Sequence, residues 1–204
     1  ENSTMLSNIL IGIPGTLIFL YIFWKRLKED YASIMIFNTA FLILGGLILL
    51  GLFAQRYAPG WWFWGASVGA FVGFLGGVTK YRLRFFETFE AASFALLPWL
   101  GLIFFDDSVK NLNLVSFTAF SLIVGLIFLF YFLDDHYKNF SWYASGRVGF
   151  AGLTTIGAFF LIRAGLASFF PFVLSFVGKY EVVLSALTAF AIFFFIYNLS
   201  RKKT

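Results

Sequence analysis

The chain has 204 residues, of which 60% are hydrophobic, only 12% are charged and 31 are phenylalanine. Such a composition leaves too few polar side chains to cover the surface of a water-soluble domain, whereas lipid readily solvates an apolar surface. The net charge of +5 is spread over short loops without a basic domain, so we expect no nucleic-acid partner. The absence of cysteine excludes disulfides, thiolate metal ligands and thiol catalysis.

The hydrophobic residues gather in stretches of roughly 20, about the length that a helix needs to cross a bilayer core of about 30 Å. The stretches are continuous rather than alternating, which favours helices over barrel strands. They are Leu6–Trp24, Ala32–Phe53, Trp62–Thr79, Ala91–Phe105, Leu114–Leu133, Val148–Phe170 and Tyr180–Leu199. The fourth is short, and the amphipathic run Phe85–Glu90 leads into it. The sequence predicts an all-α, polytopic membrane protein with seven transmembrane helices, formed by residues 1–204 as a single domain.

The lysine and arginine residues are unevenly divided between the two alternating sets of loops. Eleven lie in one set, whereas the other holds only Arg56, Lys110 and Lys179. Because cytoplasmic loops carry the excess of basic residues, this bias predicts an external N-terminus and a cytoplasmic C-terminus. The remaining basic residue, Arg163, falls inside the sixth predicted span.

Glycine recurs every four residues along the third predicted span, at Gly65, Gly69, Gly73 and Gly77. One face of this helix is therefore smooth, and such faces allow close packing of a neighbouring membrane helix. The alternative is that a lipid tail lies along the same face. Several tryptophans, Trp64 among them, precede these glycines and fit a belt of aromatic side chains at the membrane interface.

Arg163 is the clearest candidate for a functional side chain. A charge within the membrane is costly, and it is expected to have a partner. That partner is either Asp106 or Asp107, at the outer end of the fourth span, or the phosphate of a lipid, which a guanidinium binds through paired hydrogen bonds. A structural alternative is that Arg163 snorkels to the outer interface and pairs with an aspartate.

Other acidic pairs give weaker signals. Asp106-Asp107 and Asp134-Asp135 resemble metal-binding carboxylate pairs, but the predicted topology places them on opposite sides of the membrane. Solvation of helix ends is the simpler interpretation. His136 is the only histidine and has no second histidine or cysteine to complete a metal site. We therefore expect no metal and no cofactor.

Several segments together resemble the bacterial prolipoprotein diacylglyceryl transferases, over roughly residues 9–167. They are Phe41–Gly46, Phe63–Gly69, Lys80–Ala91, Leu96–Pro98, Ser145–Leu153 and Gly157–Phe159. That family has seven spans with the N-terminus outside. Its members transfer a diacylglyceryl group from phosphatidylglycerol to the lipobox cysteine of a prelipoprotein.

The chain departs from the family at the residues that carry the reaction. The family's essential histidine falls on Trp64, and its second-span arginine falls on Leu47. Residues 102–108 replace the family's Gly-Arg-x-Gly-Asn segment. Arg163 matches the late sixth-span arginine with a shift of about one helical turn, while Ala167 stands where a glutamate is expected.

The resemblance implies a phospholipid-binding protein of the bacterial cytoplasmic (inner) membrane. Its implied partners are an anionic phospholipid such as phosphatidylglycerol and a prelipoprotein or other membrane protein. The catalytic candidates are Arg163, with Asp106 or Asp107 as the base, and the lipid-binding candidates are Arg56, Trp64, Gly65, Gly69 and Arg163. The alternatives are a non-catalytic lipid-binding or scaffold subunit that keeps the fold and, third, a small transporter.

Overall fold

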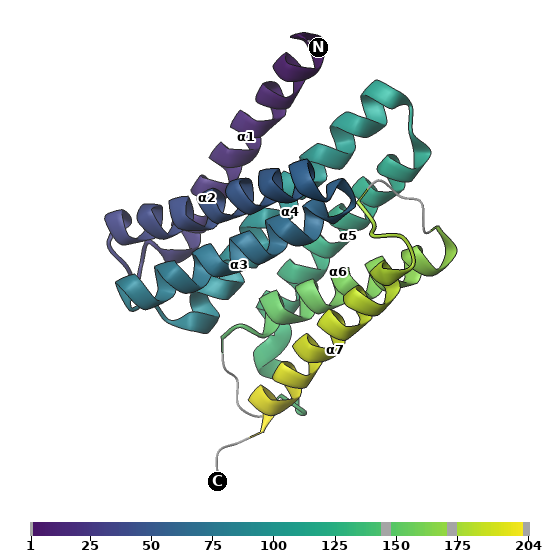
Figure 1. Cartoon of the computed structure of the whole chain (residues 1–204). Helices are drawn as coiled ribbons and strands as arrows, with labels where there is room; N and C mark the ends of the chain where they lie inside the picture. The colour runs from purple at the N-terminus through teal and green to yellow at the C-terminus, as the bar shows by residue number, and fades with distance from the viewer. Residues whose placement is uncertain (1, 144–147, 171–174, 202–204) are drawn as a thin grey trace.

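A computed structural model describes residues 2–143, 148–170 and 175–201, with side chains described from residue 12 onward. Within these ranges, seven long helices follow one another (Figure 1). They are α1 (Asn2–Leu27), α2 (Ser33–Tyr57), α3 (Trp62–Tyr81), α4 (Phe85–Asn111), α5 (Leu114–His136), α6 (Phe150–Phe169) and α7 (Tyr180–Ser200). Short 3₁₀ turns occur at Pro59–Trp61 and Tyr137–Asn139, and these ranges contain no strand. The predicted all-α class is confirmed.

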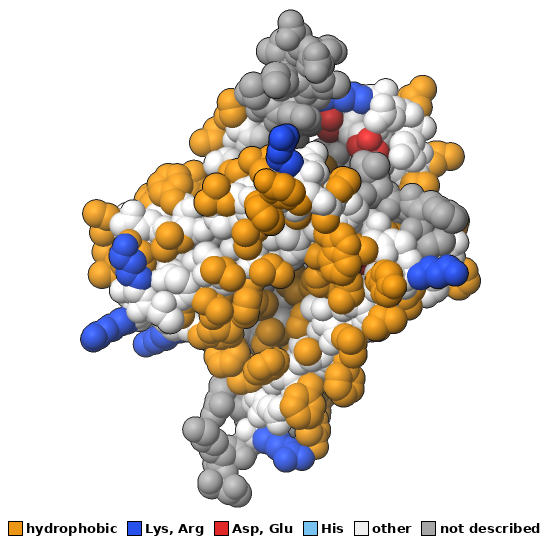
Figure 2. All heavy atoms as spheres, in the orientation of Figure 1, with side chains coloured by type: hydrophobic (Ala, Val, Ile, Leu, Met, Phe, Trp, Pro, Cys, Tyr) orange, Lys and Arg blue, Asp and Glu red, His pale blue; other side chains and the backbone are white. Residues whose placement is uncertain are grey.

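Six of the helices, α2 to α7, are long and apolar enough to cross a membrane. Figure 2 shows hydrophobic side chains spread over much of the visible face, as expected for a surface in contact with lipid. α4 begins at Phe85, so the amphipathic run belongs to the same helix as the span it precedes. A multi-pass membrane protein is therefore supported, while seven spans and an external N-terminus stay predictions. Ser145–Arg147 of the family-like segments lie outside the described residues.

The glycine face of α3 packs against α2, and the two helices lie side by side in Figure 1. A Cβ atom on Gly69 would overlap the backbone carbonyl of Gly46, and one on Gly73 would overlap that of Leu42. A Cβ on Gly65 would come within 2.5 Å of the Ala54 methyl group. The packing interpretation of this face is confirmed, and α2 occupies the position that a lipid tail would need.

Aromatic side chains fill the contacts among the other helices. Phe19 and Phe23 of α1 are fully buried in a cluster with α2, α3 and α4. Phe94 of α4 stacks on Phe130 of α5, with ring centroids 4.3 Å apart. At the start of α3, Trp64 stacks on Phe160 of α6 at 5.6 Å. This last contact brings the α2–α3 pair against α6, next to the polar site described below.

Candidate functional site

Arg163 of α6 and Glu181 of α7 form a buried ion pair. The guanidinium Nε donates to Oε1 of the carboxylate at 2.7 Å, and the two residues are only 5% and 0% exposed. Isolated charges at such positions would lose several kilocalories per mole of solvation, so each depends on the other. Because α6 and α7 are consecutive helices that pack together, the pair joins them.

The Glu181 carboxylate accepts hydrogen bonds from four donors. Besides Arg163, these are the Ser185 hydroxyl at 2.6 Å, the Trp64 indole N–H at 3.0 Å and the backbone N–H of Val177 at 3.3 Å. A carboxylate offers about four lone-pair positions. Glu181 is therefore saturated, and through Trp64 it also anchors the beginning of α3.

The Arg163 guanidinium is held by further contacts around its edge and its faces. Nη2 donates to the Ser175 carbonyl at 2.6 Å, and Nη1 donates to the Ser175 hydroxyl at 3.3 Å. Its Cζ lies 3.6 Å from the ring centroid of Phe63 and 4.7 Å from that of Phe176, in cation–π contacts. Among the described residues, the second N–H of each Nη atom has no acceptor.

An apolar groove of about 300 Å³ runs beside this guanidinium, and Arg163 and Ser175 are part of its wall. Most of the wall comes from α5 between Leu114 and Leu126, and from α6 between Phe159 and Leu166. At about 1.5 Å per helical residue, the α5 stretch is about 18 Å long. The groove is therefore elongated along the helices, and its mostly apolar wall carries three polar side chains, those of Thr118, Arg163 and Ser175.

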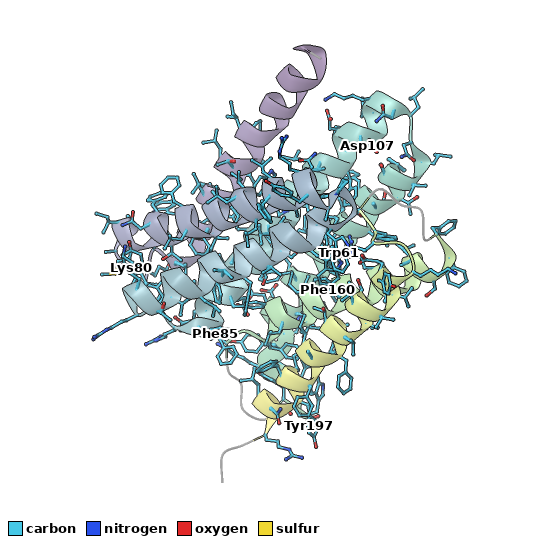
Figure 3. All side chains as sticks on the ribbon, in the orientation of Figure 1. Trp61, Lys80, Phe85, Asp107, Phe160 and Tyr197 are labelled. Atoms are coloured by element: carbon cyan, nitrogen blue, oxygen red, sulfur yellow. The ribbon has the colours of Figure 1, made fainter. Side chains whose placement is uncertain are left out.

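The two aspartates predicted as bases are not partners of Arg163. Asp106 pairs with Lys110 at 2.6 Å, one turn further along α4. Asp107 accepts from the Ser116 hydroxyl and, at 2.7 Å, from the Asn111 side chain, so it joins the end of α4 to the start of α5. In Figure 3, Asp107 lies near the end of α4, well apart from Phe160, which is one turn before Arg163. Asp106 is thus paired within α4, and only Asp107 connects α4 to α5.

The other residues predicted to bind lipid lie in different parts of the structure and do not all form one site with Arg163. Arg56 is exposed at the end of α2 and is not among the contacts of Arg163. Trp64 does belong to the buried network, as a donor to Glu181. Gly65 and Trp64 also line a second apolar depression of about 420 Å³, formed by the α2–α3 pair and Leu184 of α7. Gly69 is buried against α2.

A second charged cluster lies where α1, α4 and α5 meet near the start of α6. Arg26 donates to Asp134 at 2.8 Å, and its Nη2 lies 3.8 Å from the Glu90 carboxylate. Glu90 in turn accepts from the backbone N–H of Gly149 at 2.9 Å. The guanidinium Cζ of Arg26 is 4.9 Å from the Phe130 ring centroid. This cluster joins α1, α4 and α5 to the start of α6.

Sequence reasoning missed both Glu181 and Glu90. Glu181 is the only acidic residue in the last predicted span, and an intramembrane acid and base on neighbouring helices are an available signal for pairing. Glu90 stands at the end of the amphipathic run and immediately before a predicted span.

Comparisons of the chain with known protein families, with curated proteins and with solved structures found no match.

Proposed function

We propose that this chain is an integral membrane protein that binds a phospholipid or related acylglycerol. One acyl chain lies in the groove between α5 and α6, and oxygen atoms at the polar end of the lipid accept hydrogen bonds from Arg163. The observation that carries the proposal is a buried guanidinium in the wall of an elongated apolar groove. Sites for small ligands combine an apolar lining with a few polar groups in this way.

The same geometry favours binding over group transfer. Diacylglyceryl transfer, which the family resemblance implies, needs a group that activates the acceptor thiol. Glu181 is the acid beside Arg163, and its lone pairs are already occupied by four donors. Asp106 and Asp107 are engaged at the α4–α5 corner. These contacts support a non-catalytic lipid-binding or scaffold role. The bacterial cytoplasmic membrane, seven spans and an external N-terminus are further parts of the proposal.

Filling the groove tests the proposal. Ala119 of α5 lines the groove, so Ala119→Phe should obstruct the acyl chain, whereas Ala186→Phe places the same side chain on an exposed position of α7. Purified wild type and variants are compared for lipid bound in native mass spectra. We expect at least a tenfold loss of bound lipid for Ala119→Phe and none for Ala186→Phe. Equal lipid binding by the two variants would refute the groove as the binding site.

A transfer assay separates the two functions. Purified protein is incubated with labelled phosphatidylglycerol and a lipobox peptide, beside an authentic transferase as the positive control. We expect lipid binding without labelled peptide. Labelled diacylglyceryl on the peptide, lost in Arg163→Ala, would instead establish the transferase function.

A further inference from the structure

We propose that Glu181 makes the groove select lipids whose polar end has no net charge, such as diacylglycerol or phosphatidylethanolamine, over anionic phospholipids. This inference rests on the proposed function, because it concerns the ligand of the same groove. It differs from the anionic lipid that the family resemblance implies.

The buried site carries no net charge. Arg163 and Glu181 carry opposite unit charges at a distance of 2.7 Å, and both are almost completely buried. Among the described residues, neither has a second ionic partner. The groove therefore meets a neutral pair, although one member of that pair is a cation.

Adding a charge to this buried site is energetically costly. A phosphodiester placed against this pair would give the site a net charge of −1 in a region of low dielectric constant, where uncompensated charge is expensive. An ester carbonyl or a hydroxyl adds no charge, and it can still accept from the N–H groups of Arg163 that lack a described acceptor. In a zwitterionic headgroup the ammonium provides the compensating charge.

Three donors besides Arg163 hold the Glu181 carboxylate in place. Ser185, Trp64 and the Val177 backbone fix Glu181 independently of Arg163. An incoming phosphate therefore has to share the guanidinium with a carboxylate that cannot turn away. Glu181 is a specificity-determining residue on this account, and it does not itself touch the lipid.

Wild-type protein provides the first test. Native mass spectrometry measures the affinity for diacylglycerol, phosphatidylethanolamine and phosphatidylglycerol with identical acyl chains. We expect the two lipids without net charge to bind at least tenfold more tightly than phosphatidylglycerol. Equal affinities, or a preference for phosphatidylglycerol, would overturn the selectivity while leaving lipid binding intact. Failure of all three lipids to bind would overturn the proposed function as well.

Two variants then test the cause. Glu181→Gln gives the site a net charge of +1 and should shift the preference toward phosphatidylglycerol by at least tenfold. Leu166→Arg adds a cation to the groove wall without removing the buried partner, and it should shift the preference in the same direction even if Glu181→Gln does not fold. Glu87→Gln, near the start of α4 and outside the groove wall, is the matched control. An unchanged preference in the folded variants would overturn the role of Glu181.

Discussion

The Glu90 carboxylate of α4 accepts a hydrogen bond from the backbone N–H of Gly149, the N-cap residue immediately before α6. The first N–H groups of a helix lack acceptors within the helix and carry partial positive charge, so a carboxylate there is stabilising. Gly149 has a φ of +106°, a region that glycine enters without steric cost. With Arg26 nearby, Glu90 connects α1, α4 and α6 at one end of the bundle.

Glu90→Gln should destabilise the protein by about 1.5–3 kcal/mol, because it removes the charge from a buried hydrogen bond and from the vicinity of Arg26. Thermal unfolding in detergent, followed by circular dichroism, measures the change. Glu29→Gln, at an exposed position after α1, is the control and should leave the midpoint unchanged. Equal effects of the two substitutions would contradict the capping role.

Arg163→Ala and Glu181→Ala should each cost about 3–5 kcal/mol, because each leaves a buried charge without its partner. Replacing both residues by alanine should cost less than the sum of the two single changes, since no charge is then left unpaired. A double-mutant cycle on unfolding midpoints provides the measurement. Additive losses would show that the pair contributes nothing as a pair.

Gly69→Ala should destabilise the α2–α3 contact by about 1–3 kcal/mol, because its methyl group would overlap the Gly46 carbonyl. Gly76→Ala is a matched control on the same helix, since nothing lies within 4 Å of a Cβ at that position. The control should be neutral or slightly stabilising, because alanine favours helix more than glycine does. The comparison requires only the two unfolding midpoints, and equal shifts would argue against close packing at Gly69.

Tyr31, in the turn between α1 and α2, gives the protein a dependence on alkaline pH. Burial, the largest cause, and the neighbouring Glu87 raise the pKa of its phenol above the ordinary value of about 10. The hydroxyl donates to Glu87 at 3.0 Å and accepts from the backbone N–H of Arg84 at 3.0 Å.

A pKa that is higher in the folded state means that the folded state holds the phenolic proton more tightly. This contribution to stability is fully present below the unfolded-state pKa, and it is lost as the pH rises through the folded-state value. Above a pH of about 10, we expect the unfolding midpoint of the wild type to decrease more steeply with pH than that of Tyr31→Phe. Parallel curves for the two proteins would contradict this assignment.

The sequence predicted those parts of the fold that depend on local pattern. Continuous apolar stretches identified the helices, and glycine spacing identified the packing face that includes Gly69. The position of Arg163 inside a span also indicated a buried site with a partner. Each of these predictions depends on spacing within one helix.

The identity of the partner of Arg163 depends on how helices pack, which the sequence pattern does not determine. The predicted topology allowed three acidic residues near the outer side of the membrane, namely Asp106, Asp107 and Glu181. The partners of the two aspartates are Lys110, Ser116 and Asn111, which lie within ten residues of them. The aspartates therefore bind local partners and not the distant Arg163. The groove could not be predicted from the sequence either, because its wall combines residues from α4, α5 and α6.

The close approach of α2 and α3 also restricts which substitutions the sequence can accept during evolution. Where backbone meets backbone, no neighbouring side chain can move aside to accommodate a larger residue. Substitution at Gly46, Gly69 or Gly73 therefore demands a shift of an entire helix, whereas the outward positions of the same helices can exchange one apolar residue for another. Drift in this protein should be slow along the seam between α2 and α3 and fast on its lipid-facing side.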